Sequence, residues 1–243
     1  MVIDTDLCQA VIFDMDGVIT DSVPVHRRAW RETFDSFLDE TGSDAPRFDE
    51  GFDYLTHVDG KPRYDGVRDF LASREIELPE GTPQDPPEEM TVCGLGNRKN
   101  EDFLEALAEV GVEPYRSTLD LIDQLRSAGI GVALITSSRN AAAVLASAEV
   151  DPAIFEAVVD GNESARLGLH GKPEPAIFLE AASRLGVEPA SAIVVEDAVS
   201  GVEAGRAGGF GGVIGIDRGS NRDGLEEAGA DVVVDDLNEV GVS

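Results

Sequence analysis

The stretch "VIFDMDGVITDS", residues 11 to 22, decides the fold of this chain. Its apolar run ends in two aspartates one residue apart, Asp14 and Asp16, and Gly17 follows them. Similar short runs rich in Val and Ile recur along the chain and alternate with segments of helical spacing. Because strands that are buried on both faces read as continuously apolar, this alternation predicts an α/β fold built on a parallel sheet.

Five such runs are the expected strands, at residues 10 to 14, 130 to 136, 192 to 196, 212 to 216 and 231 to 234. Two of the helices that connect them are indicated by apolar residues three and four apart. Their apolar positions are Leu121, Ile122 and Leu125 before a stop at Gly129, and Ile177, Phe178, Ala181 and Leu185 before a stop at Gly186. These are the crossover helices that parallel strands require.

The interval between the first two expected strands is far longer than a crossover connection. Helical spacing within it is carried by Trp30, Phe34, Phe37 and Leu38. We therefore expect an inserted helical domain over residues 23 to 111, in a core domain formed by residues 1 to 22 and 112 to 243. Four prolines between residues 79 and 87 exclude regular helix and predict an irregular excursion over residues 74 to 97.

The composition excludes several classes of partner and location. Against 19 Lys plus Arg stand 48 Asp plus Glu, a formal charge of -29, so neither nucleic acid nor an anionic membrane is an expected partner. Such acidity keeps a protein hydrated and monomeric in high salt, and a salt-rich habitat is one explanation for it. No segment approaches the roughly 18 uninterrupted apolar residues of a membrane span, and the first ten residues show no basic region followed by an apolar run, so we expect neither secretion nor membrane insertion. Cys8 and Cys93 are too few for a disulfide framework, which favours free thiols in the cytoplasm.

Polar residues at the strand ends are the candidates for chemistry, because open α/β sheets bind ligands beyond the carboxyl ends of their strands. These candidates are Asp14 and Asp16, Thr136, Ser137 and Ser138, Lys172, and Glu196 and Asp197. Each has an ordinary alternative: a solvated turn for the aspartates, helix capping for Thr-Ser-Ser and Glu-Asp, and a surface charge for the lysine. Their shared position at one edge of one sheet favours a functional site. Only three lysines occur among the 19 basic residues, and one of them is Lys172.

Several carboxylates at one edge would repel one another unless a cation neutralised them. Oxygen ligands without His or Cys select Mg²⁺, which keeps open positions for a phosphate oxygen. The hydroxyl cluster and the lysine are donors suited to phosphate. Asp14 is then the expected nucleophile on phosphorus, forming an aspartyl-phosphate, and Asp16 the general acid and base.

The motifs "FDMDGVITDS", "LITSSRN", "HGKPEPAIF" and "VVEDAVSG" resemble, in order and spacing, those of the haloacid dehalogenase superfamily and its β-phosphoglucomutase-like subfamily. The resemblance implies a Rossmann-like three-layer core with an inserted helical cap. It implies that Asp14 is the nucleophile, Asp16 the acid/base, and that Thr136 and Lys172 bind the transferring phosphoryl group. It also implies that Asp197 and Glu196 ligate Mg²⁺ together with Asp14 and the backbone carbonyl of Asp16.

The insert resembles the helical cap of that subfamily in three places. His26 matches a hinge histidine that helps position the acid/base, Arg63 in "DGKPRYDGV" matches an arginine that binds the non-transferring phosphate, and "RKN" suggests Lys99 and Asn100 as sugar contacts. In the core, Ser138, Arg139 and Asn140 match the phosphate-side loop, next to Ser137. Two features depart from the subfamily pattern: the excursion lengthens the cap, and Thr136 stands where Ser is common.

Three functions are compatible with these residues. A mutase would return phosphate from Asp14 to a second hydroxyl of the sugar, a phosphatase would pass it to water, and a non-catalytic protein would only bind the sugar phosphate. The intact pair of aspartates argues against the last. His26, Arg63 and Lys99 favour the mutase, so we expect a Mg²⁺-dependent phosphotransferase that interconverts β-glucose 1-phosphate and glucose 6-phosphate through glucose 1,6-bisphosphate, with the sugar-phosphate phosphatase as the alternative.

Overall fold

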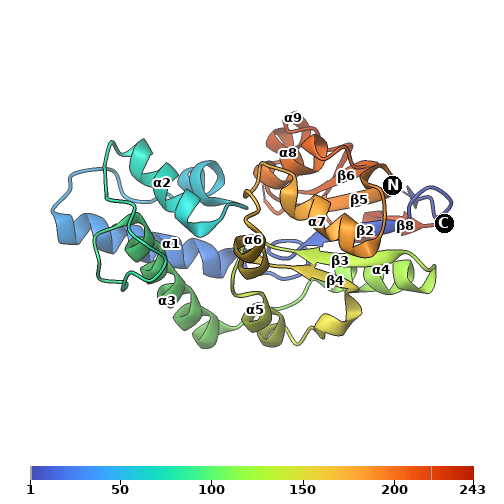
Figure 1. Cartoon of the computed structure of the whole chain (residues 1–243), viewed down its shortest axis with the longest axis horizontal. Coiled ribbons are helices and arrows are strands. Elements are labelled where there is room, and N and C mark those ends of the chain that lie inside the picture. Colours follow the sequence, from blue (N-terminus) through green and yellow to red (C-terminus); the bar gives the residue numbers. More distant parts are fainter. Residues whose placement is uncertain (1, 220) are drawn as a thin grey trace. The chain divides into compact units, whose positions relative to one another are not determined.

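The computed structural model describes residues 2–219 and 221–243 (Figure 1). The chain divides into two compact units, one made of Met1–Asp21 and Glu113–Ser243 and the other of Ser22–Val112. We call the first unit the core and the second the insert. The insert predicted from the sequence, residues 23 to 111, is one residue shorter at each end than the observed unit.

A six-stranded parallel sheet forms the centre of the core. Its strands in spatial order are β4 (Ala157–Val159), β3 (Gly131–Ile135), β2 (Ala10–Asp14), β5 (Ala192–Glu196), β6 (Gly212–Ile216) and β7 (Val232–Val234). The register pairs Asp14 with Ile135 on one side of β2 and Phe13 with Val195 on the other. The carboxyl ends of β3, β2 and β5 therefore lie side by side at one edge. A separate parallel pair joins β1 (Val2–Ile3) to β8 (Gly241–Val242).

Helices flank the sheet of the core (Figure 1). They are α4 (Arg116–Ser127), α5 (Ala141–Ser147), α6 (Gly161–Leu167), α7 (Ala176–Leu185), α8 (Val199–Ala207) and α9 (Arg222–Glu227), with short 3-10 helices at Pro152–Ile154, Pro189–Ser191 and Leu237–Glu239. On one face of the sheet, Ile12 and Ile135 belong to a buried cluster with Phe178 of α7 and Val202 of α8. Burial of this apolar surface is the main force that holds the strand ends in register.

The predicted strands at residues 10 to 14, 192 to 196 and 212 to 216 are confirmed residue for residue. β3 is one residue shorter at each end than predicted, and β7 begins one residue later. β4 was not predicted, because its three residues are too few to show a strand pattern. α7 and α4 both stop at the predicted glycines, Gly186 and Gly129, which have positive φ values; the last helical residue of α4 is Ser127.

The insert contains α1 (Val23–Thr41), a π-helical turn at Tyr54–Val58, α2 (Arg63–Ser73) and α3 (Val92–Val110). Its buried cluster confirms the helical pattern read from the sequence, because Trp30, Phe34, Phe37 and Leu38 all lie on the inner face of α1. Phe34 stacks on Phe70 of α2 with 3.8 Å between ring centroids. The insert therefore has a hydrophobic core of its own.

The predicted excursion over residues 74 to 97 is too long at its C-terminal end. Helix α3 already begins at Val92, and the Thr91 side chain accepts a hydrogen bond from the Gly94 N–H at 2.9 Å. The physical reason is that proline restricts only its own neighbourhood, and the last proline of the segment is Pro87. Beyond it a threonine N-cap is sufficient to start the helix.

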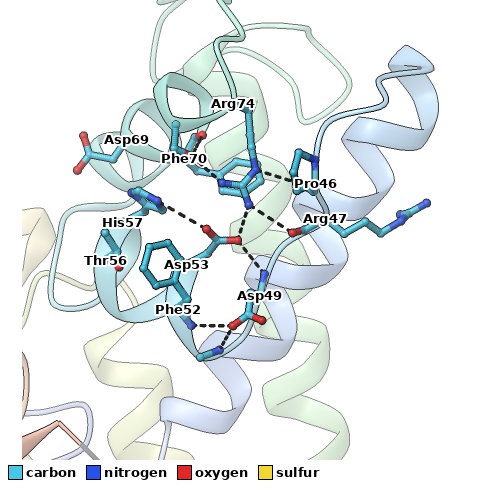
Figure 2. A network of polar contacts seen from close by, with 12 residues as sticks. Pro46, Arg47, Asp49, Phe52, Asp53, Thr56, His57, Asp69, Phe70 and Arg74 are labelled. Carbon is cyan, nitrogen blue, oxygen red and sulfur yellow. Dashed lines mark hydrogen bonds and ion pairs between the residues drawn. The ribbon is translucent and has the colours of Figure 1, made fainter.

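A buried ion pair ties the irregular parts of the insert together (Figure 2). Asp53, only 2% exposed, accepts a hydrogen bond from the Asp49 N–H at 2.8 Å and pairs with the Arg74 guanidinium. Arg74 also donates from Nε to the Pro46 carbonyl at 3.0 Å and lies 4.5 Å from the ring centroid of Phe70. Arg74 thus links the end of α2 to the loop that precedes the π-helical turn.

Two predictions from composition can be compared with the structure. Cys8 and Cys93 are both buried free cysteines, which confirms the prediction of unpaired thiols. Over residues 2–219 and 221–243, no helix combines the length and the apolar character needed to cross a membrane.

Candidate active site

The carboxyl edge of β3, β2 and β5 brings together the core residues that the sequence analysis selected. Asp14 is the last residue of β2, Thr136 follows β3, and Glu196 is the last residue of β5. Thr136 extends the ladder, since its N–H donates to the Val159 carbonyl of β4 at 3.1 Å. Because the parallel register pairs Asp14 with Ile135 and Phe13 with Val195, these three residues lie within one residue of the same level at the carboxyl edge.

Lys172 lies between two buried carboxylates. Its Nζ donates to Asp14 Oδ1 at 2.6 Å and to Glu196 Oε1. All three side chains are almost fully buried, with residue exposures of 4%, 5% and 0% for Lys172, Asp14 and Glu196. A buried ammonium held by two carboxylates is a fixed positive charge next to the candidate nucleophile.

Burial and neighbouring charges shift the pKa values of Asp14 and Lys172 in opposite directions. Burial raises the pKa of the Asp14 carboxyl well above its usual range, while the Lys172 ammonium opposes that shift and Glu196 adds to it. For Lys172, burial alone would lower the pKa, but the carboxylates of Asp14 and Glu196 together raise it. The lysine is therefore charged throughout the physiological pH range and favours the ionised form of Asp14.

Three carboxylates form a candidate metal site. Oxygens of Asp14, Glu196 and Asp197 all lie within 4.8 Å of one another. Against their three negative charges the cluster contains the single ammonium of Lys172, so a divalent cation would neutralise the excess. The oxygen-only donor set fits Mg²⁺. Glu196 Oε2 also accepts the N–H groups of Asp197 and Ala198, both at 3.0 Å.

Asp16 has a different environment from the metal cluster. The Thr136 hydroxyl donates to Asp16 Oδ2 at 3.0 Å, and the Asp16 N–H donates to Asp14 Oδ2 at 3.1 Å. Thr136 is itself held, because its Oγ1 accepts the Ser138 N–H at 3.0 Å. The carboxylate of Asp16 is therefore near the candidate nucleophile without belonging to the three-carboxylate group, an arrangement that suits a proton carrier.

Gly17 explains why the chain can turn so tightly here. It has a φ of +78°, and a Cβ built on it would lie 1.8 Å from Asp197 Oδ2. Only glycine combines this conformation with such a close approach. Gly201, on helix α8, allows a similar close approach, since a Cβ there would lie 1.9 Å from Glu196 Oε1. From the sequence, Gly17 was predicted only as a turn residue, and Gly201 was not identified.

The loop after β3 is fixed by hydrogen bonds to its own main chain and to α6. Ser138 Oγ accepts the Asn140 N–H at 3.1 Å, and the Arg139 carbonyl accepts the Asn162 side-chain amide at 2.8 Å. A Cβ on Gly161 would lie 2.5 Å from the Ser137 carbonyl, so α6 packs directly against the loop. The loop that contains Ser137 to Asn140 is thus a rigid element of the core.

The insert contains the other residues suggested by the resemblance. Lys99, 5% exposed, has its Nζ 2.8 Å from His26 Nδ1 and 4.8 Å from the ring centroids of both Trp30 and Phe103. The His26 ring stacks on Phe103 with 4.2 Å between centroids. An ammonium that donates to Nδ1 places the imidazole proton on Nε2. Within the insert, His26 and Lys99 therefore form one unit.

Arg63 and Asn100 lie on helices α2 and α3 of the insert. Arg63 is the first residue of α2, its Cζ lies 5.2 Å from the Tyr64 ring centroid, and its buried Nε has no hydrogen-bond acceptor among the described residues. Asn100 lies on α3, one residue after Lys99. The approach of His26, Arg63, Lys99 and Asn100 to a substrate remains a prediction.

The chain is similar to known proteins along almost its whole length. A family model described as haloacid dehalogenase-like hydrolase matches residues 8–209. A protein named beta-phosphoglucomutase from Mycobacterium tuberculosis is 45% identical over 239 residues, 96% of this chain and 91% of the relative. A Bacillus subtilis protein of the same name is 32% identical over 230 residues, which are 93% of this chain and 88% of that relative. A crystal structure of a mutant CbbY from Rhodobacter sphaeroides in complex with xylulose-(1,5)bisphosphate matches with a TM-score of 0.73 and 26% identity, over 97% of both chains.

Proposed function

The chain belongs to the haloacid dehalogenase-like hydrolase family, as its motifs predict, and from this premise we propose that it is a Mg²⁺-dependent phosphotransferase that interconverts β-glucose 1-phosphate and glucose 6-phosphate. The observation that carries the proposal is the buried carboxylate of Asp14, held at 2.6 Å by the Lys172 ammonium and followed two residues later by Asp16. The identity of 45% to a beta-phosphoglucomutase over nearly the full length of both chains supports the choice of reaction.

In the proposed mechanism, Asp14 attacks phosphorus and forms an aspartyl-phosphate while the bond to the sugar oxygen breaks. Asp16 protonates that leaving oxygen and later takes the proton from the hydroxyl that accepts the phosphoryl group. Lys172 and the Thr136 hydroxyl offer positive charge and a hydrogen bond to the phosphoryl oxygens. The carboxylates of Asp14, Glu196 and Asp197 and the carbonyl of Asp16 would hold Mg²⁺, which would supply positive charge that neutralises the transferring group.

A mutase must also hold the second phosphate of the bisphosphate intermediate. We assign this task to Arg63 of the insert, and we assign contacts with the sugar to His26, Lys99 and Asn100. The core loop of Ser137, Ser138, Arg139 and Asn140 is assigned as the phosphate-side loop that also contacts the substrate. The buried Nε of Arg63, which has no acceptor among the described residues, supports the assignment because a guanidinium is a natural partner for phosphate.

A phosphatase is the second candidate, because it needs the same aspartates and differs only in that water attacks the aspartyl-phosphate. The neighbour in complex with xylulose-(1,5)bisphosphate shows that a related fold accepts a five-carbon sugar bisphosphate. A protein that binds sugar phosphates without turnover is disfavoured by the complete set of Asp14, Asp16 and Lys172 at one edge of the sheet.

The test supplies purified protein with Mg²⁺, β-glucose 1-phosphate and a trace of glucose 1,6-bisphosphate, and follows glucose 6-phosphate and free phosphate in parallel. The Asp14→Asn variant is the blank. Glucose 6-phosphate that forms much faster than phosphate supports the mutase. If phosphate forms without glucose 6-phosphate, the protein is a phosphatase and not a mutase. If neither product forms with any hexose phosphate or pentose bisphosphate tried, the proposed substrate class is refuted.

A further inference from the structure

A cation from a distant loop of the core reaches the turn after β2. Arg218, in the segment that follows β6, donates from Nε to the Gly17 carbonyl at 2.7 Å, across 201 residues of sequence. Gly17 comes directly after Asp16, the candidate acid/base. Hydrogen bonds from a charged donor to a main-chain carbonyl are stronger than neutral ones, so this contact fixes the peptide between Gly17 and Val18.

The Arg218 guanidinium is itself held in place. Its Cζ lies 3.6 Å from the ring centroid of Tyr115, and its Nη1 lies 3.9 Å from Asp236 Oδ2, which also accepts the Ser117 hydroxyl at 2.9 Å. The Arg218 side chain is only 17% exposed. Stacking on an aromatic face restricts a guanidinium to one plane, so the direction of the Nε–H bond toward Gly17 is determined by the fold.

The turn that Arg218 contacts lies next to two residues of the proposed mechanism, Asp16 and Asp197. The Gly17 N–H donates to the Thr20 carbonyl at 2.8 Å, and the α-carbon of Gly17 lies against the Asp197 carboxylate closely enough to exclude any side chain. A shift of the Gly17 peptide would therefore move Asp16 on one side and disturb Asp197 on the other. Displacements of about 1 Å in such positions reduce turnover by about a hundredfold.

Tyr115 makes two hydrogen bonds to the segment that follows this turn. Its N–H donates to the Ile19 carbonyl at 2.9 Å, and its hydroxyl donates to Asp21 Oδ1 at 2.9 Å. Burial and the hydrogen bond to Asp21 raise the pKa of the Tyr115 hydroxyl, so it remains a donor at every physiological pH. The ring that supports Arg218 is thus anchored at both ends to the segment that the arginine holds.

We propose that Arg218, supported by Tyr115, is a positioning residue that sets the place of Asp16 through the Gly17 carbonyl. The inference rests on the proposed phosphoryl transfer for its effect on turnover. A nearby arginine offers a matched control: Arg222 donates to the Val233 carbonyl at 2.7 Å and to Asp235 at 2.6 Å, on a side chain that is 39% exposed, and it has no contact with the turn among those described.

The experiment compares Arg218→Ala with Arg222→Ala by steady-state kinetics and by hydrogen exchange of the peptide that covers residues 15 to 21. We expect Arg218→Ala to lower kcat by about tenfold to a hundredfold, with KM for the sugar phosphate within about twofold, and to speed exchange in that peptide. Arg222→Ala should leave kcat, KM and exchange of the peptide unchanged. Arg218→Lys should recover part of kcat, and Tyr115→Phe, which keeps the ring, should retain more activity than Tyr115→Leu.

Three results would overturn the inference: equal kcat in the two alanine variants, unchanged exchange in residues 15 to 21, or a rise in KM at constant kcat. If the wild-type protein turned over no sugar phosphate, the proposed function would fail, and the exchange of the peptide would still decide whether Arg218 holds the turn. Should Arg218→Ala not fold, Arg218→Lys and Tyr115→Leu give the same comparison.

Discussion

Replacing Lys172 by methionine should destabilise the core strongly in the absence of Mg²⁺. The change keeps most of the side-chain volume but removes the ammonium that lies between Asp14 and Glu196, which are 5% and 0% exposed. Removal of one partner from a buried ion pair leaves an uncompensated charge and lowers the free energy of unfolding by about 3–5 kcal/mol. We expect a loss of that size at pH 7.

The loss should depend on pH with a definite sign. In Lys172→Met, burial and repulsion from Glu196 raise the folded-state pKa of Asp14 above the unfolded value of about 4, because the opposing ammonium is gone. Folding of the variant then takes up a proton, so its free energy of unfolding falls as pH rises above about 4, by up to about 1.4 kcal/mol per pH unit. From about pH 5.5 to pH 7 the deficit relative to wild type should therefore grow by about 2 kcal/mol. The wild-type lysine stays charged across this range.

Urea denaturation followed by circular dichroism measures the effect, at constant ionic strength and without divalent cations. Lys61→Met is the matched control, because Lys61 pairs with the half-exposed Asp69 in the insert, and loss of such a surface pair changes the free energy of unfolding by less than about 1 kcal/mol. The single tryptophan, Trp30, reports on the insert. The reasoning fails if Lys172→Met loses no more stability than Lys61→Met, or if its deficit is the same at both pH values.

Three further predictions concern activity. Asp14→Asn should abolish mutase and phosphatase turnover, and residual transfer above about a thousandth of wild type, measured with freshly purified protein, would contradict its role as nucleophile. Asp16→Asn should slow turnover by about a hundredfold or more while Mg²⁺ binding, measured by calorimetry, survives, because its carboxylate lies outside the three-carboxylate group. Arg63→Ala should raise the KM for a sugar monophosphate well above that of Arg47→Ala, since Arg47 pairs with exposed Asp39 on the surface of the insert; equal values would remove Arg63 from the phosphate site.

Local sequence patterns were sufficient for the elements that are continuous and buried. The strand at residues 10 to 14 and the helix that stops at Gly186 follow directly from an apolar run and from a glycine in the left-handed conformation. The three-residue β4 and the start of α3 at Val92 were not predicted correctly. A very short edge strand is defined by its neighbour β3, and a helix start among acidic and proline residues depends on a single capping threonine.

The candidate residues of the core could be found from the sequence because the ends of parallel strands share one edge, whatever the length of chain between them. Their individual environments could not. Lys172 was expected only at the phosphate, and the structure places its ammonium on both Asp14 and Glu196, while Glu196 also accepts two main-chain N–H groups.

The sequence by itself determined the α/β class, the insertion after the first sheet strand and the residue types at the carboxyl edge, because apolar periodicity, glycine turns and the residue that ends each strand are local properties of the sequence. Only the tertiary structure decided which charges pair. The contact of Lys172 with Asp14 spans 158 residues and that of Arg218 with Gly17 spans 201. Contacts of this kind depend on register and packing, and these exist only once the whole sheet has formed.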